Sequence, residues 1–190
     1  VDLKPQDHVF ATLHLTSSQP MEAVLMWSDT TNANFPGCNA IPFEIGAGED
    51  YLTLPLTDTA MWTGAVKRLQ LSLTGKAGQS VTLHGLSFGK LPEGPAKLTI
   101  ASMSAKHSIY SVGEEVLLTV RTRNDGGQSA QNVSFRLTAG NADAVVASED
   151  LLTLADLQPG ATSSVSWKVR ATKPGVVPLT VRATADGILR

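Results

Sequence analysis

The sequence predicts an all-β protein made of two tandem β-sandwiches, and three observations carry this prediction. Short runs of alternating apolar and polar residues recur along the chain, with Gly, Pro, Asn or Asp between them. Strands at regular short spacing are typical of sandwiches and barrels. No segment sustains the 3.6-residue apolar period of a helix. A stiff polar bridge at residues 89–95 divides the pattern, so we expect domains at residues 1–91 and 96–190.

The first half contains six predicted strands, at residues 8–15, 21–28, 41–45, 51–56, 66–73 and 81–88. In the first strand, the odd-numbered residues from Val9 to Leu15 are apolar and share one face. In the fifth, Leu69, Leu71 and Leu73 alternate with polar residues and are expected to point inward. In the last, the apolar positions change parity at Gly85. A period-2 pattern that slips by one residue at a glycine predicts a β-bulge.

The second half reads as strands at residues 97–103, 116–123, 131–137, 164–170 and 177–184, with a weaker section at 144–154. Residues 124–127, Asn-Asp-Gly-Gly, form a turn of residue types that accept positive φ. Trp167 alternates with valines and is expected in the core. About seven strands with this alternation predict an immunoglobulin-like sandwich.

Composition narrows the class of protein. The 190 residues are 42% hydrophobic and 17% charged, with a formal net charge of -2 and no Lys/Arg cluster, which argues against nucleic acid and anionic membrane surfaces as partners. No apolar run reaches the ~18–20 residues that cross a bilayer. The chain begins at Val1 without a signal-peptide pattern, so we expect a mature segment or a fragment of a longer protein. Cys38 is the single cysteine, which excludes an internal disulfide framework.

The sequence shows no motif of a catalytic, metal or cofactor site. It has no G-x-S-x-G, no H-E-x-x-H, no paired cysteines and no glycine-rich loop leading into a helix. The four histidines, His8, His14, His84 and His107, are scattered along the chain and are interpreted as surface or interface residues. We therefore predict that the protein is not an enzyme and has no metal and no cofactor.

A sugar-binding site is expected where aromatic rings and polar side chains meet in a loop of the first domain. Phe35 lies in a polar loop without the apolar alternation that would predict a buried ring. Asp29, Asn32 and Asn34 are close to it in sequence. Their oxygens offer hydrogen bonds to sugar hydroxyls or ligands for calcium. Trp62 precedes a strand and either closes the end of the sandwich or stacks on a ligand. Packing of Phe35 on its own domain is the alternative for that loop.

The first half resembles galactose-binding-like jelly-roll modules. The resemblance rests on residues 62–71, Trp-Thr-Gly-Ala-Val-Lys-Arg-Leu-Gln-Leu, and on the closing strand at 81–88, with similar strands at 23–27 and 51–56. It implies a jelly-roll-like first domain that binds carbohydrate. Such modules are often appended to secreted bacterial glycoside hydrolases.

The second half resembles CARDB-type and NPCBM-associated bacterial immunoglobulin-like domains. The residues that carry the resemblance are Val112-Gly113-Glu114, Asn124-Asp125-Gly126, Leu157-Gln158-Pro159-Gly160 and Trp167-Lys168-Val169. It implies a spacer or adhesion domain and an extracytoplasmic location: secreted, periplasmic or on the cell surface.

Together these observations favour a non-catalytic accessory region of an exported bacterial protein, attached to an enzyme that acts on polysaccharide. Its expected partners are a polysaccharide or other glycan and the neighbouring domains of a larger parent chain, with no nucleic acid and no membrane span. The alternative is a purely structural or adhesive cell-surface module with protein partners and no sugar site.

Overall fold

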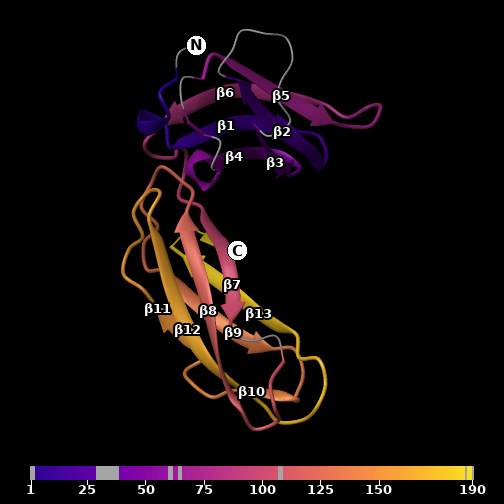
Figure 1. Ribbon diagram of the computed structural model, residues 1–190, viewed down its shortest axis with the longest axis vertical. Coiled ribbons are helices and arrows are strands. Elements are labelled where there is room, and N and C mark those ends of the chain that lie inside the picture. The colour runs from indigo at the N-terminus through magenta and orange to yellow at the C-terminus, as the bar shows by residue number, and fades with distance from the viewer. Residues whose placement is uncertain are drawn as a thin grey trace. The chain divides into compact units, whose positions relative to one another are not determined.

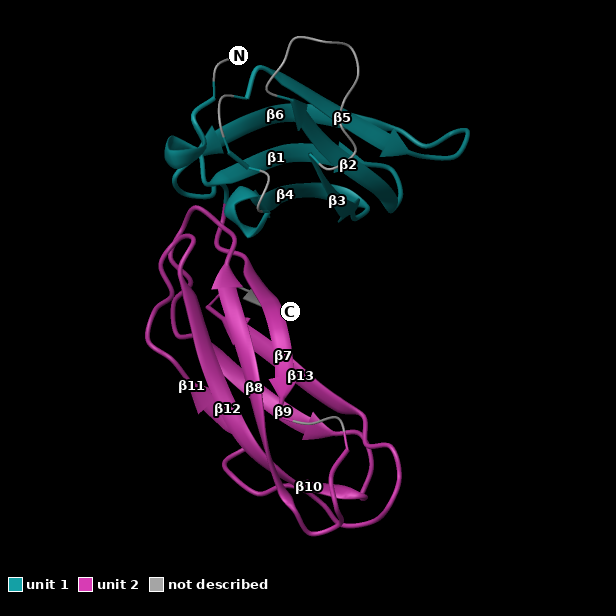
Figure 2. Ribbon diagram, in the orientation of Figure 1, with its two compact units in different colours: residues 1–94 teal, residues 95–190 magenta. Residues whose placement is uncertain are grey.

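The computed structural model describes residues 3–28, 39–59, 62–63, 66–106 and 109–186, together with the backbone of residues 188–189. Regular structure within these residues consists of β-strands and two single 3₁₀ turns, so the all-β prediction is confirmed. The chain forms two compact units, residues 1–94 and 95–190 (Figures 1 and 2). Each unit has a hydrophobic core of its own.

Unit 1 is built from two three-stranded antiparallel sheets, ordered β4-β1-β6 and β3-β2-β5. Its strands are β1 (Phe10–Ser17), β2 (Met21–Ser28), β3 (Ala40–Ile45), β4 (Gly48–Pro55), β5 (Arg68–Thr74) and β6 (Val81–Gly89). The 3₁₀ turns are η1 (Pro5–Asp7) and η2 (Leu56–Asp58). The jelly-roll resemblance of this unit stays a prediction, since the described residues form six strands where a complete jelly roll has eight.

The core of unit 1 lies between its two sheets, where every second residue of the central strands β1 and β2 is apolar and buried. On β1 the inward residues Ala11, Leu13 and Leu15 are all fully buried. On β2, Leu25 and Trp27 face them and are equally buried. Burial of side chains of this size contributes roughly 1.5–3 kcal/mol each to stability, so these two strands carry much of the unit's folding free energy.

Unit 2 is a sandwich of two four-stranded antiparallel sheets, ordered β10-β12-β8-β7 and β11-β9-β13-β14. The strands of the first sheet are β7 (Leu98–Ala105), β8 (Glu115–Asn124), β10 (Ala144–Val146) and β12 (Thr162–Ala171). Those of the second are β9 (Ser134–Ala139), β11 (Leu151–Thr153), β13 (Leu179–Ala185) and β14 (Ile188–Leu189). Trp167 on β12 is fully buried between the sheets, as its alternation with valines predicts.

A buried asparagine fixes the start of unit 2. The side-chain oxygen of Asn124 accepts hydrogen bonds from the backbone N–H groups of Lys97 at 3.1 Å and Gly126 at 3.0 Å. Its amide nitrogen donates to the carbonyls of Gln128 at 2.7 Å and Leu157 at 2.9 Å. Asn124 is fully buried, so one buried side chain satisfies four backbone groups from three segments of the chain.

Two details of unit 2 differ from the sequence prediction. The predicted strand at 131–137 begins only at Ser134, because Asn132 adopts a φ of 50°, a left-handed conformation that a strand does not accommodate. The weak section at 144–154 forms two short strands, β10 and β11, which pair in opposite sheets. The chain therefore crosses from one sheet to the other between Val146 and Leu151, where no single alternation can persist.

Candidate functional site

The most organised group of polar side chains in unit 1 lies on the outer face of sheet β4-β1-β6. Alternation along β1 sends Leu13 and Leu15 into the core and His14 and Thr16 to the opposite face. Because the inner face is occupied by packing, the outer face of the central strand is where polar side chains of three strands meet.

The β-bulge predicted at Gly85 is confirmed and brings a second histidine to this face. His14 pairs with Gly85 and Leu15 pairs with Leu83, so His84 is the extra residue in β6. The His84 and His14 rings lie with centroids 4.7 Å apart at an interplanar angle of 40°. The Nε2 atom of His84 is 2.8 Å from the Thr16 hydroxyl oxygen. The bulge thus places two imidazoles next to each other from residues 70 positions apart in sequence.

Strand β4 supplies the other side of the group. Tyr51 pairs with His14 across the ladder, and their rings stack with centroids 4.2 Å apart and planes within 6°. Glu49 lies two residues earlier on the same strand, and its Oε1 accepts a hydrogen bond from His14 Nε2 at 2.7 Å. We call His14, Thr16, Glu49, Tyr51 and His84 the outer-face cluster.

The charge of the cluster is set by the contact between His14 and Glu49. The hydrogen bond from His14, together with Coulombic attraction to its imidazole when that ring is protonated, lowers the pKa of the Glu49 carboxyl below its ordinary value, and His84 adds a smaller effect in the same direction. Glu49 is 64% exposed, so water screens the pair and its contribution to stability is small. Its consequence is orientation, because the carboxylate holds the imidazole parallel to the Tyr51 ring.

A shallow hollow of ≈ 250 Å³ lies beside the cluster, lined by Thr12, His14, Tyr51, Gly85, Leu86, Ser87 and Glu93. Gly85 has no side chain, which leaves space opposite His14. On the other side, Gly94 adopts a φ of +88° and lies so close to Tyr51 that an added Cβ would be 2.5 Å from the ring. Only glycine accepts both conditions, so the bridge residues pack against the tyrosine and help to fix it.

The hollow combines hydrogen-bonding side chains with ring surfaces in a fixed arrangement. Hydroxyl and imidazole groups donate and accept hydrogen bonds, and a carboxylate accepts them. Stacking of the two rings holds the His14 imidazole and the Tyr51 hydroxyl in place. Because this pair is preorganised, a ligand loses less free energy in ordering side chains when it binds. The arrangement suits a small ligand rich in hydroxyl groups.

Of the five site residues predicted from sequence, four lie outside the described residues: Asp29, Asn32, Asn34 and Phe35. The fifth, Trp62, is buried at 5% exposure. Its indole N–H donates to the His8 carbonyl at 2.7 Å, and its ring contacts Trp27 edge-to-face at 5.3 Å and stacks on Phe88 at 6.3 Å. These contacts favour the interpretation of Trp62 as a plug at the end of the sandwich over stacking on a ligand.

The outer-face cluster is absent from the sequence-based site, and the reason is topological. His14 and His84 look scattered along the chain because β1 and β6 are sequence-distant neighbours in the sheet. The signal that could have found them is the parity change at Gly85 combined with the outward parity of His14, once the two strands are known to pair.

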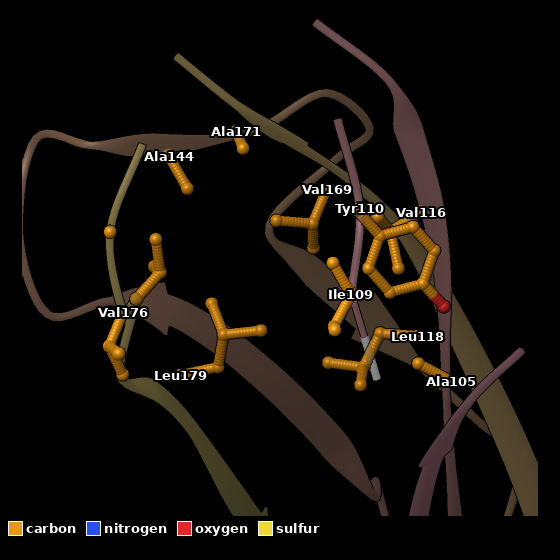
Figure 3. A pocket seen from close by; sticks show the side chains of 12 residues that line it. Ala105, Ile109, Tyr110, Val116, Leu118, Ala144, Val169, Ala171, Val176 and Leu179 are labelled. Carbon is orange, nitrogen blue, oxygen red and sulfur yellow. The ribbon is translucent and has the colours of Figure 1, made fainter. Parts of the chain in front are cut away.

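Unit 2 contains a pocket of a different kind, with a volume of ≈ 550 Å³. Figure 3 shows the side chains that surround it, which are almost all aliphatic. It lies between the two sheets at the end of unit 2 where β7 and β12 finish and β13 begins.

Within the described parts of the chain, no group of three or more His, Cys, Asp or Glu residues could hold a metal ion. The outer-face cluster contains two histidines and one carboxylate, but His14 Nε2 and His84 Nε2 are directed to Glu49 and Thr16. Among those same residues, no helix has the length and apolar character that a bilayer crossing requires.

Comparison with known proteins gives one finding, which concerns unit 2. Residues 95–188 match the model of the CARDB family. No curated protein matches the chain. The CARDB part of the sequence resemblance is therefore supported, whereas the galactose-binding-like part is not. CARDB domains are non-catalytic β-sandwich domains of proteins that are often extracellular, and unit 2 is similar to them in sequence and in architecture.

Proposed function

We propose that this chain is a non-catalytic accessory region of an exported bacterial protein, in which unit 1 binds a glycan and unit 2 spaces it from its neighbours. The similarity of unit 2 to CARDB domains supports the accessory and extracellular parts of this proposal. The outer-face cluster with its adjacent hollow is the observation that supports glycan binding by unit 1.

The chemistry of the hollow favours a neutral sugar. Unit 1 carries five basic and nine acidic side chains, and Glu93 lines the hollow itself. A uronate or a sulfated glycan would meet this negative charge, whereas the hydroxyls of a neutral sugar hydrogen-bond to Ser87 and Glu93, which both line the hollow, at no electrostatic cost. Affinity should be weak, on the order of 0.1–1 mM, because a small polar ligand offers little apolar area and exchanges good hydrogen bonds with water.

The test is calorimetric titration of the full chain with neutral oligosaccharides, namely cello-, xylo-, manno- and galacto-oligosaccharides. Ser87 is half-buried and lines the hollow, so Ser87→Ala should leave the fold intact and weaken binding by up to about tenfold, the effect of losing one hydrogen-bonding partner. Ser166→Ala is the matched control, because it removes a polar side chain from an outer sheet face of unit 2, where Ser166 contacts Thr119 at 2.9 Å. Equal affinity in both variants would place the sugar elsewhere.

The competing function is a structural or adhesive module with protein partners and no sugar site. The observation that favours it is the extent of the family match, which begins at residue 95 and covers unit 2 but not unit 1. Absence of binding to all four oligosaccharide series, with capture of a defined surface protein by the same chain, would select this alternative. Attachment to a polysaccharide-acting enzyme is a separate part of the proposal, and the sequence of the parent protein tests it.

A further inference from the structure

The pocket of unit 2 has a buried floor and an exposed apolar mouth. Leu118 and Val169 form part of the floor and are each 5% exposed. Ile109 and Val176 border the pocket and are 89% and 90% exposed. Among the described residues these are the two most exposed large hydrophobic side chains, and both lie at this one site.

The backbone immediately before Val176 adopts a conformation that favours glycine. Val176 follows Gly175, whose φ of +146° is strained for any other residue, and is itself 90% exposed. Single exposed apolar side chains are ordinary on protein surfaces. Two of them beside a cavity that continues into the core form a concave apolar surface, which is the usual character of a small-molecule site.

The lining restricts what the pocket can hold. Of the described residues that line it, Tyr110 alone carries a polar atom in its side chain, the oxygen drawn in red in Figure 3. A sugar or a peptide segment would have to bury hydroxyl, N–H or C=O groups there without side-chain partners, which costs several kcal/mol in general. An aliphatic chain buries only CH₂ and CH₃ groups and incurs no such penalty.

We propose that this pocket binds the aliphatic chain of a single amphiphile, such as a free fatty acid, with the head group remaining in water at the mouth. A volume of ≈ 550 Å³ is within the range of pockets that enclose small organic ligands. A free amphiphile is favoured over a bilayer surface, because two exposed aliphatic residues without a basic cluster are too few to anchor a domain on a membrane. This site belongs to unit 2 and does not depend on the glycan proposal for unit 1.

The experiment is titration of the full chain with dodecanoate and with a nonionic dodecyl detergent, both below their micelle concentrations, followed by calorimetry and by the melting temperature. We expect one binding event per protein and a higher melting temperature for unit 2 with both ligands. Val176→Asp should weaken binding at least tenfold. The matched control Val112→Asp introduces the same charge at another exposed valine, which does not line the pocket, and should bind like the parent.

A second variant keeps the test decisive in case the new carboxylate of Val176→Asp weakens binding by lowering the stability of unit 2. Ala171→Phe adds a ring inside the pocket, so it should abolish binding while the melting temperature without ligand stays the same or rises. The proposal is overturned if neither amphiphile binds, if binding requires the carboxylate head group, or if Val176→Asp and Ala171→Phe bind like the parent. Binding to phosphatidylcholine vesicles in the absence of binding to free amphiphile would also overturn it.

Discussion

Replacement of Asn124 by alanine tests the structural basis of unit 2 most sharply. The substitution removes four hydrogen bonds at once and leaves the Lys97 and Gly126 N–H groups and the Gln128 carbonyl without this partner, while the Leu157 carbonyl keeps its hydrogen bond from the Ala130 N–H. A net hydrogen bond contributes about 0.5–1.5 kcal/mol, and a buried group left unsatisfied costs ~1–3 kcal/mol. With partial access of water to the opened site, we expect Asn124→Ala to lower the free energy of unfolding by about 3–5 kcal/mol.

Hydrogen exchange of the full chain in increasing urea, resolved by peptide mass spectrometry, measures this loss separately for each unit. Peptides of unit 2 should lose protection by that amount, while those of unit 1 keep theirs. Ser166→Ala, which removes only an exposed hydrogen bond, serves as the control and should change stability by less than about 0.5 kcal/mol. A loss below about 1 kcal/mol in Asn124→Ala would refute the reasoning, since it would mean that the backbone groups left by the side chain find other partners.

Three further predictions concern unit 1. Trp62→Ala should destabilise it by about 3–5 kcal/mol in urea unfolding, since a buried plug leaves a cavity; a loss under about 1 kcal/mol would restore a ligand role for this ring. Gly94→Ala should cost at least about 1 kcal/mol and shift the NMR signals of the Tyr51 ring, because its Cβ meets that ring and its φ is positive; unchanged signals would contradict this. Carbon-13 titration should give the Glu49 carboxyl a pKa below 4.5. The contribution of Glu49 to stability is then complete above pH 4.5 and is lost as pH falls through the lowered pKa. His14→Ala should raise this pKa, and an unaltered pKa would exclude His14 as the cause.

Alternation and turn chemistry were sufficient to predict the all-β class and much of the core. Trp167 was expected in the core from the valines around it, and the structure confirms this. The parity change at Gly85 predicted the bulge, which is also confirmed. These features are local, since a period-2 pattern reports directly which face of a strand is buried.

The outer-face cluster could not be predicted because it depends on which strands are neighbours. His14 and His84 meet only because β6 pairs with β1, and strand order in a sheet is a non-local property. Burial shows the same limit on β5, where Leu73 was expected inward with Leu69 and Leu71 but is 43% exposed. Alternation indicates on which face of a strand a residue lies. How far the core extends along that strand depends on which residues of the opposite sheet cover it.

The motif that carries the resemblance of unit 2 to CARDB domains has a physical explanation in the structure. In Asn124-Asp125-Gly126, the asparagine satisfies four backbone groups, and the glycine is required because a Cβ would overlap the Pro95 carbonyl. Gly113 adopts a φ of +87°, and its N–H donates to the Ala171 carbonyl at 2.9 Å. Residue identities with such specific demands can be recognised in sequence, whereas an outer sheet face accepts many polar residues and leaves no motif.

The most direct test of the central claim is an NMR map of the full chain during titration with a neutral oligosaccharide. Glycan binding at the outer-face cluster predicts saturable shifts of the His14 and His84 imidazole signals and of the Ser87 amide, with the amides of unit 2 unchanged. Shifts confined to residues 29–37 would move the site to the loop predicted from sequence. No saturable shift in unit 1 with any neutral oligosaccharide would contradict the proposal that this unit binds sugar.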